Sequence, residues 1–275
     1  MSYFSMNTWS IHRHLGPLRW TVWNEEEKRH DTHVDPQPET TTLLELPAVL
    51  AEKGFGAVDV CHFHIPRTDA EYLVELREAF RSSGVAFHTL LLDYGDISSS
   101  DELRRASDMA LAKEWIGIAA QAGAGHIRII AGQAQPDSAE ALERAYESLA
   151  ELAAWAEKHG VRIVTENFRP LASTSANCLA IKSRLGDAIG LIGDFGNFVK
   201  EVRREELAAI LPFCGSVHAK PEFDVEGRPI EAEFRDLLQL LPDSGYDGPI
   251  TLIYDGPGDM WEGVERVRAI AKDYV

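Results

Sequence analysis

The sequence contains little cysteine, little basic charge and no long apolar run. Its three cysteines, Cys61, Cys178 and Cys214, are scattered along 275 residues without CxxC spacing. We therefore expect neither a disulfide framework nor a thiolate zinc site, and a reducing compartment fits. No segment approaches the roughly 20 apolar residues of a membrane span, and the N-terminus has no basic region followed by an apolar run. These absences predict a cytoplasmic protein with no membrane partner.

The charge balance excludes a second class of partner. Acidic residues number 44 and basic residues 27, which gives a formal net charge of −17. Because nucleic-acid binding needs a basic surface, no nucleic-acid partner is expected. The apolar content of 45% is high enough for a sizeable core and excludes intrinsic disorder. No GxGxxG motif follows the first expected strand, which argues against a dinucleotide-binding fold.

What the sequence does contain is an alternation of apolar strands with helices that end at glycine. The expected strands are 3–9, 57–62, 85–92, 125–130, 161–166, 189–194, 215–219 and 249–254. The expected helices are 43–53, 68–83, 100–122, 138–159, 173–185, 203–211, 232–241 and a last one from about 260. Eight such units in a chain of this length favour a (β/α)8 TIM barrel of the α/β class over a doubly wound sheet.

The domain prediction is a single barrel over residues 1–275, with one interruption. Residues 10–40 lack clean periodicity, so we expect an irregular insertion after the first strand. With Trp20, Trp23 and four histidines, it would cover the barrel mouth or pack as a surface loop on a neighbouring subunit.

Polar side chains stand where three of the apolar strands end. Glu166 closes the strand at 161–166, Asp194 closes the strand at 189–194, and His218 lies near the end of the strand at 215–219. In a TIM barrel these ends meet at one rim, so the three side chains should converge. Two carboxylates and an imidazole suit Mn²⁺, Mg²⁺, Co²⁺ or Zn²⁺. Each residue alone fits a helix cap or an ion pair equally well, but the three together favour a metal site.

Other residues at the same rim are candidates for chemistry and for substrate contact. Glu166, Lys220 and Asp255 are the candidates for proton transfer. The candidates for substrate binding are Trp9, His62, His64, His88, Arg128 and Arg169. His62 and His64 fit structural histidines as well as they fit ligand contacts.

These residues carry a resemblance to a known family. The chain resembles the xylose isomerase-like TIM barrels, the sugar phosphate isomerase/epimerase superfamily. The matching stretches are Ser5–Trp9, Leu50–Asp59, Thr165–Asn167, Gly193–Asn197, Val217–Lys220 and Gly245–Ile250. The resemblance implies a small carbohydrate substrate and an isomerase or epimerase that activates the proton next to a sugar carbonyl. It also implies one divalent metal held by a Glu, an Asp, a His and a second Glu, and Glu166, Asp194 and His218 match the first three.

The fourth ligand of the family does not match. Ile253 stands where the resemblance implies the second glutamate, and an isoleucine offers no lone pair and carries no proton. Asp255, two residues further along, would replace it only if its loop were rearranged. This departure leaves two alternatives open: a lyase or dehydratase, and a metal-free carbohydrate-binding or non-catalytic subunit. An abasic-site endonuclease, which shares the barrel, is disfavoured by the net charge. A homo-oligomer stays open as an assembly.

Overall fold

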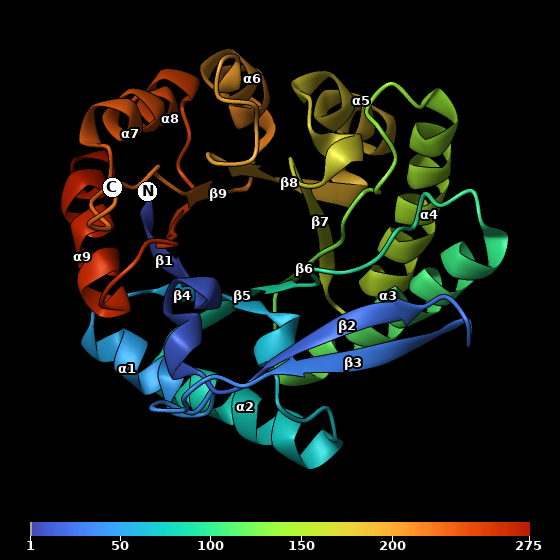
Figure 1. Cartoon of the computed structure of the whole chain (residues 1–275), viewed down its shortest axis with the longest axis horizontal. Helices are drawn as coiled ribbons and strands as arrows, with labels where there is room; N and C mark the ends of the chain where they lie inside the picture. The colour runs from blue at the N-terminus through green and yellow to red at the C-terminus, as the bar shows by residue number, and fades with distance from the viewer. Residues whose placement is uncertain (1) are drawn as a thin grey trace.

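The computed structural model describes residues 2–275 and has a closed barrel of eight parallel strands at its centre (Figure 1). Around the barrel the strands follow the order β1-β10-β9-β8-β7-β6-β5-β4. Their bounds are Tyr3–Asn7 (β1), Ala57–Cys61 (β4), Ala86–Leu91 (β5), His126–Arg128 (β6), Arg162–Glu166 (β7), Ile189–Asp194 (β8), Ser216–Ala219 (β9) and Pro249–Leu252 (β10). The predicted TIM barrel is therefore confirmed.

The helices surround the barrel on the outside (Figure 1). The α-helices are Leu46–Glu52 (α1), Ala70–Ser83 (α2), Glu102–Ala122 (α3), Ala139–Lys158 (α4), Ser175–Leu185 (α5), Arg203–Ile210 (α6), Glu231–Leu238 (α7), Leu240–Ser244 (α8) and Met260–Ala271 (α9). Short 3-10 helices are Thr8–His14 (η1), His62–His64 (η2), Pro170–Ala172 (η3), Gly186–Ala188 (η4), Leu211–Phe213 (η5) and Lys272–Tyr274 (η6). Within residues 2–275, no helix combines the length and the apolarity that a membrane crossing requires.

Local side-chain chemistry fixes where the helices begin and end. Asp69 caps α2 by accepting a hydrogen bond from the backbone N–H of Tyr72, and Asp101 caps α3 in the same way. Both helices end at a glycine in the left-handed conformation, Gly84 at φ 73° and Gly123 at φ 83°. A side chain with a Cβ would be strained there, which is why glycine marks these ends in the sequence.

Among the strand bounds that differ from the expected ones, the ends of β1 and β10 affect the barrel mouth. β1 stops at Asn7 rather than Trp9, because the side chain of Asn7 accepts a hydrogen bond from the N–H of Trp9 at 2.8 Å and opens η1. β10 stops at Leu252, so Ile253 begins the loop after the strand. Both differences move side chains from a strand into the loops that line the barrel mouth.

The insertion at residues 10–40 is not irregular, and that expectation was wrong. It contains η1 and an antiparallel hairpin of β2 (Leu18–Asn24) and β3 (Arg29–Asp35). The hairpin is only partly buried on both faces, so its sequence lacks the alternation of a strand with one apolar face. His30 of β3 ties it to α3 through a 2.8 Å contact with Asp108.

Candidate metal and substrate site

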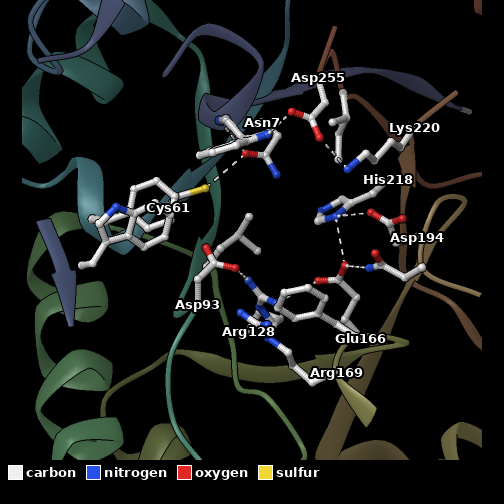
Figure 2. Close-up of a pocket in the computed structure, with 17 residues that line it drawn as sticks. Asn7, Cys61, Asp93, Arg128, Glu166, Arg169, Asp194, His218, Lys220 and Asp255 are labelled. Atoms are coloured by element: carbon white, nitrogen blue, oxygen red, sulfur yellow. Dashed lines mark hydrogen bonds and ion pairs between the residues drawn. The ribbon is translucent and has the colours of Figure 1, made fainter. Parts of the chain in front are cut away.

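A cavity of about 250 Å³ opens at the C-terminal ends of the barrel strands (Figure 2). The predicted site residues that line it are Trp9, Arg128, Glu166, Arg169, Asp194, His218, Lys220 and Asp255. Residues outside the predicted set that also line it are Asn7, Trp20, Cys61, Phe63, Leu91, Asp93, Phe168, Asn197 and Ile253. The location agrees with the rule that TIM barrels carry their functional residues at this end.

The three predicted metal ligands converge at the cavity. One ligand atom from each of Glu166, Asp194 and His218 lies within 4.8 Å of the others, and all three side chains are buried. Nδ1 of His218 is 3.5 Å from Oε1 of Glu166 and 3.6 Å from Oδ2 of Asp194. Strands β7, β8 and β9 are neighbours in the barrel, which brings the three residues together.

The imidazole of His218 is oriented by a buried carboxylate on the far side of the ring. Nε2 of His218 lies 3.1 Å from Oδ2 of Asp59, and the same oxygen accepts a hydrogen bond from the hydroxyl of Thr251 at 3.1 Å. With its Nε2 proton directed at Asp59, a neutral His218 turns the lone pair of Nδ1 toward the other two ligands. Metal-binding histidines are commonly held in this way, so the donor set fits a divalent ion.

The electrostatics of this group also favour a cation. Burial alone would lower the pKa of His218, but Glu166 and the other surrounding carboxylates raise the pKa well above its ordinary value. The cluster therefore holds positive charge strongly, either as a proton on the imidazole or as a bound metal ion. The group of Glu166, Asp194 and His218 could thus hold a metal ion.

The carboxylate of Glu166 is fixed by groups on both of its oxygens. Asn197 donates a hydrogen bond to Oε1 at 3.0 Å, and the buried guanidinium of Arg128 lies 3.3 Å from Oε2. Arg128 also pairs with Asp93 at the end of β5, so it links two carboxylates across the cavity. These contacts fix the position of the Glu166 carboxylate on the cavity wall.

Asp194 is held in position by Asn167 and by the backbone of its own loop. The side chain of Asn167 spans the backbone of Asp194, accepting from its N–H at 2.7 Å and donating to its carbonyl at 2.9 Å. Oδ1 of Asp194 accepts from the N–H of Gly196 at 2.6 Å, while Oδ2 faces His218. The Glu-Asn and Asp-x-Gly stretches thus interlock and fix two ligands at adjacent strand ends.

Lys220 and Asp255 form an ion pair beside His218 and Asp194 in Figure 2. Nζ of Lys220 donates to Oδ2 of Asp255 at 3.0 Å, and the indole of Trp9 donates to Oδ1 at 2.9 Å. Burial alone would lower the pKa of Lys220, but the carboxylates of Asp194, Asp255 and Glu166 raise it. The ammonium form of Lys220 is therefore favoured at neutral pH.

An aromatic wall closes one side of the cavity. The rings of Trp20 and Phe63 are 4.3 Å apart, and Trp9 meets Phe63 edge-on at 6.0 Å. Trp20 comes from the β2–β3 hairpin, so the insertion contributes directly to the cavity lining. Aromatic faces of this kind suit the apolar C–H faces of sugar rings.

Three histidines predicted to contact substrate lie outside the cavity, which corrects their placement. His62 sits on η2 between Thr21 and the N–H of Asp93, and His64 is buried against Thr8. His88 lies near the start of β5 and faces Asp59 at 3.1 Å. It lines a separate cavity with the first residues of β6, β7 and β9, at the opposite end of the barrel. Strand alternation predicts whether a side chain points into the barrel, but not its position along the barrel axis. The position of His88 near the start of β5 keeps it out of the cavity at the other end.

Several residues of the site were not predicted from the sequence. Asp93 lies two residues beyond β5, and Asn197 lies three residues beyond Asp194. Both are polar residues that follow a strand, so a search extended past the strand ends would have found them. Asp59 ends the matching stretch Leu50–Asp59, but nothing in that stretch indicates that it contacts His218. These residues orient the predicted ligands.

Comparison with known proteins identifies the family of the fold. The family model described as "Xylose isomerase-like TIM barrel" matches residues 47–270. Among curated proteins, no sequence matches the chain significantly.

Solved structures with the same fold have low sequence identity to the chain. An L-ribulose 3-epimerase superposes with a TM-score of 0.74 at 16% identity, covering 100% of this chain and 96% of the other. A D-allulose 3-epimerase from Methylomonas sp. gives a TM-score of 0.72 at 15% identity, with 100% and 98% covered. A xylose isomerase-like TIM barrel protein from Mycobacterium smegmatis, solved in complex with magnesium, gives 0.63 at 20% identity, with 83% and 87% covered. At these identities the likeness establishes the fold alone.

Proposed function

The chain belongs to the xylose isomerase-like TIM barrel family. We propose that it is a divalent-metal-dependent sugar isomerase or epimerase. Its reaction moves a proton at the carbon next to the carbonyl of a sugar or keto-sugar. The observation that carries the proposal is the buried group of Glu166, Asp194 and His218 on the cavity wall. Structural neighbours named as sugar 3-epimerases support the same reaction class.

Within this proposal the metal has one role. Mn²⁺, Mg²⁺, Co²⁺ or Zn²⁺, held by Glu166, Asp194 and His218, supplies electrophilic stabilisation of the substrate oxygens when bound. Mg²⁺ and Mn²⁺ suit the two carboxylates best.

The side chains of the cavity supply the proton transfers. Glu166 is the base, because its carboxylate lines the cavity and is held in position by Arg128 and Asn197. Lys220 is the acid, because its raised pKa keeps it protonated. Asp255 orients Lys220 through the 3.0 Å ion pair. Glu166 ends β7 and Lys220 follows β9, so this acid and base do not depend on the second glutamate that the resemblance implies at Ile253.

A lyase is the second candidate, and the same pair of residues motivates it. Glu166 would take the proton next to the carbonyl, while the ammonium of Lys220 would protonate a departing hydroxyl group. Ile253 favours this reading, because an elimination needs no proton returned to the substrate carbon.

The two candidates are separated by following keto-sugars in D₂O by NMR with Mn²⁺-loaded protein. An epimerase gives a product with deuterium at the carbon next to the carbonyl. An isomerase gives a product with deuterium at the carbon that was the original carbonyl, and a lyase gives an unsaturated or deoxy product. Glu166→Gln should lower turnover about tenfold or more. The exposed Glu157→Gln should leave turnover unchanged. Unchanged turnover in Glu166→Gln would contradict the assignment.

The metal requirement is tested separately. Elemental mass spectrometry of protein purified without chelator, and again after incubation with Mn²⁺, should detect one ion per chain. If neither sample holds metal while sugars still bind without turnover, the metal-free carbohydrate-binding subunit replaces the proposal.

A further inference from the structure

Arg169 is a cation at the cavity whose charge is not paired with any residue in the described part of the chain, 2–275. It follows β7 directly after Glu166, Asn167 and Phe168, lines the cavity and is exposed at its mouth. Its guanidinium lies 4.6 Å from the centre of the Phe168 ring. Across residues 2–275, its side chain forms no hydrogen bond or ion pair with another side chain or with the backbone.

The other two cations of the cavity are neutralised. Arg128 lies between Asp93 and Glu166, and Lys220 pairs with Asp255. Arg128 also lies over the Phe168 ring at 4.7 Å, so both guanidinium groups are stacked against the same aromatic side chain. Stacking fixes the plane of Arg169 without occupying its N–H donors.

The backbone of Arg169 is held in a conformation that side chains rarely adopt. Its φ of 68° with ψ of 164° belongs to a region that is essentially confined to glycine. The ring of Pro170 restricts the ψ of Arg169 to the extended range, and the carbonyl of Arg169 accepts from the N–H of Ala172 at 3.2 Å. Glycine would adopt this conformation without strain, yet the chain carries an arginine here. Such strain gathers at ligand-binding positions.

The charge balance of the cavity agrees with an anionic ligand. The lining carries four carboxylates and three cationic side chains. A divalent ion at Glu166, Asp194 and His218 therefore leaves one net positive charge on the lining, within a chain whose net charge is −17. A neutral sugar would leave this charge unmatched.

We propose that Arg169 binds an oxyanionic group of the substrate, a carboxylate or a phosphate, so that the substrate is an acidic sugar derivative rather than a neutral one. The guanidinium matches either group with paired N–H donors. This inference rests on the proposed function, because it names the class of sugar that the same cavity takes.

The test measures binding of compounds that cannot react. An alditol, the aldonate of the same carbon number and the alditol phosphate all lack a ketone or aldehyde, so their affinity is independent of turnover. Isothermal titration calorimetry of Mn²⁺-loaded protein should give one of the anions about tenfold or more tighter binding than the alditol. The aldonate and phosphate arms identify which oxyanion is preferred.

The decisive quantity is the ratio of anion affinity to alditol affinity in the variants, because an anion can also contact the metal. Arg169→Gln should reduce this ratio about tenfold, and Arg169→Lys should retain part of it. Arg184→Gln, an exposed arginine of α5 outside the cavity, is the charge-matched control and should leave the ratio unchanged. Equal ratios in wild type and Arg169→Gln, or no preference for either anion, would overturn the inference.

The outcome is separable from that of the proposed function. An anion preference lost in Arg169→Gln, together with no turnover of any keto-sugar or keto-sugar acid, would preserve the anion site and reject the proton-transfer reaction. Turnover of neutral keto-sugars with no Arg169-dependent anion preference would preserve the proton-transfer reaction and reject the anion site.

Discussion

The ring of His218 lies between Asp59, 3.1 Å from Nε2, and the two carboxylates that face Nδ1. Asp59 is fully buried at 0% exposure and comes from β4, which is separated from β9 by β1 and β10 in the barrel. It also receives His88 on its second oxygen, at 3.1 Å. The contact is therefore a buried link that fixes the ring of a metal ligand from within the barrel.

Asp59→Asn should weaken metal binding while keeping the shape of the side chain. An amide places either a weaker acceptor or a donor against Nε2. The ring of His218 is then less firmly oriented, and its Nδ1 is less basic. We expect Mn²⁺ affinity to fall about 10- to 100-fold, as for other carboxylates behind a ligating histidine. Calorimetric titration of the metal-free protein measures this, with the exposed Asp187→Asn as control. An Mn²⁺ affinity equal to that of wild type would show that the contact is dispensable.

Ile253→Glu should strengthen metal binding, because Ile253 lines the cavity where the family carries its second glutamate. An added charged ligand raises affinity for a divalent ion, by about tenfold or more relative to the uncharged Ile253→Gln. Without metal, the new carboxylate is buried among other acids and should lower thermal stability. The thermal shift on adding Mn²⁺ should thus be larger for Glu than for Gln. Equal shifts would mean that residue 253 does not face the ion.

The buried histidines should make the protein sensitive to acid. Burial lowers the pKa of His64 to about 3 and that of His62 to about 4, from an ordinary value of 6.5. The unfolded chain therefore binds protons that the folded chain does not, and stability falls as the pH drops from 6.5 toward 4. At about 1.4 kcal/mol per pKa unit, each histidine accounts for on the order of 3 kcal/mol.

His64→Gln should flatten this dependence, since it removes the histidine whose pKa is lowered to about 3. Urea unfolding at pH 7.0, 5.5 and 4.5 measures the free energy of unfolding. The exposed His33→Gln on the hairpin is the control and should follow the wild-type curve. A slope for His64→Gln that parallels wild type would reject the role of His64.

Arg169→Gly should stabilise the protein while removing the anion preference. Glycine adopts the φ of 68° without strain. Relief of about 1–3 kcal/mol, less the added flexibility of glycine in the unfolded chain, should raise Tm by about 2–4 °C. Arg169→Ala removes the same side chain but keeps the strain, so its Tm should not rise. If both variants melt alike, the strain at this residue is not significant.

The amino-acid pattern was enough to predict the barrel and the convergence of Glu166, Asp194 and His218. Buried parallel strands are apolar on both faces, so they appear as short apolar runs, and the polar residue that ends each run marks the barrel mouth. Glu166, Asp194 and His218 were predicted in this way. The position of each depends only on where its own strand ends.

The residues that contact these three side chains could not be predicted from the sequence pattern. Asp59 and His218 are 159 positions apart, and their contact depends on closure of the barrel and on the register shift of β4 against β5 between Val58 and Asp59. His88 lies too near the start of β5 to reach the cavity at the C-terminal ends of the strands. Trp20 reaches that cavity because the β2–β3 hairpin packs over it. Strand patterns encode which face a side chain takes. Its height along the barrel axis, and the residue it meets across the interior, follow from packing of the whole chain.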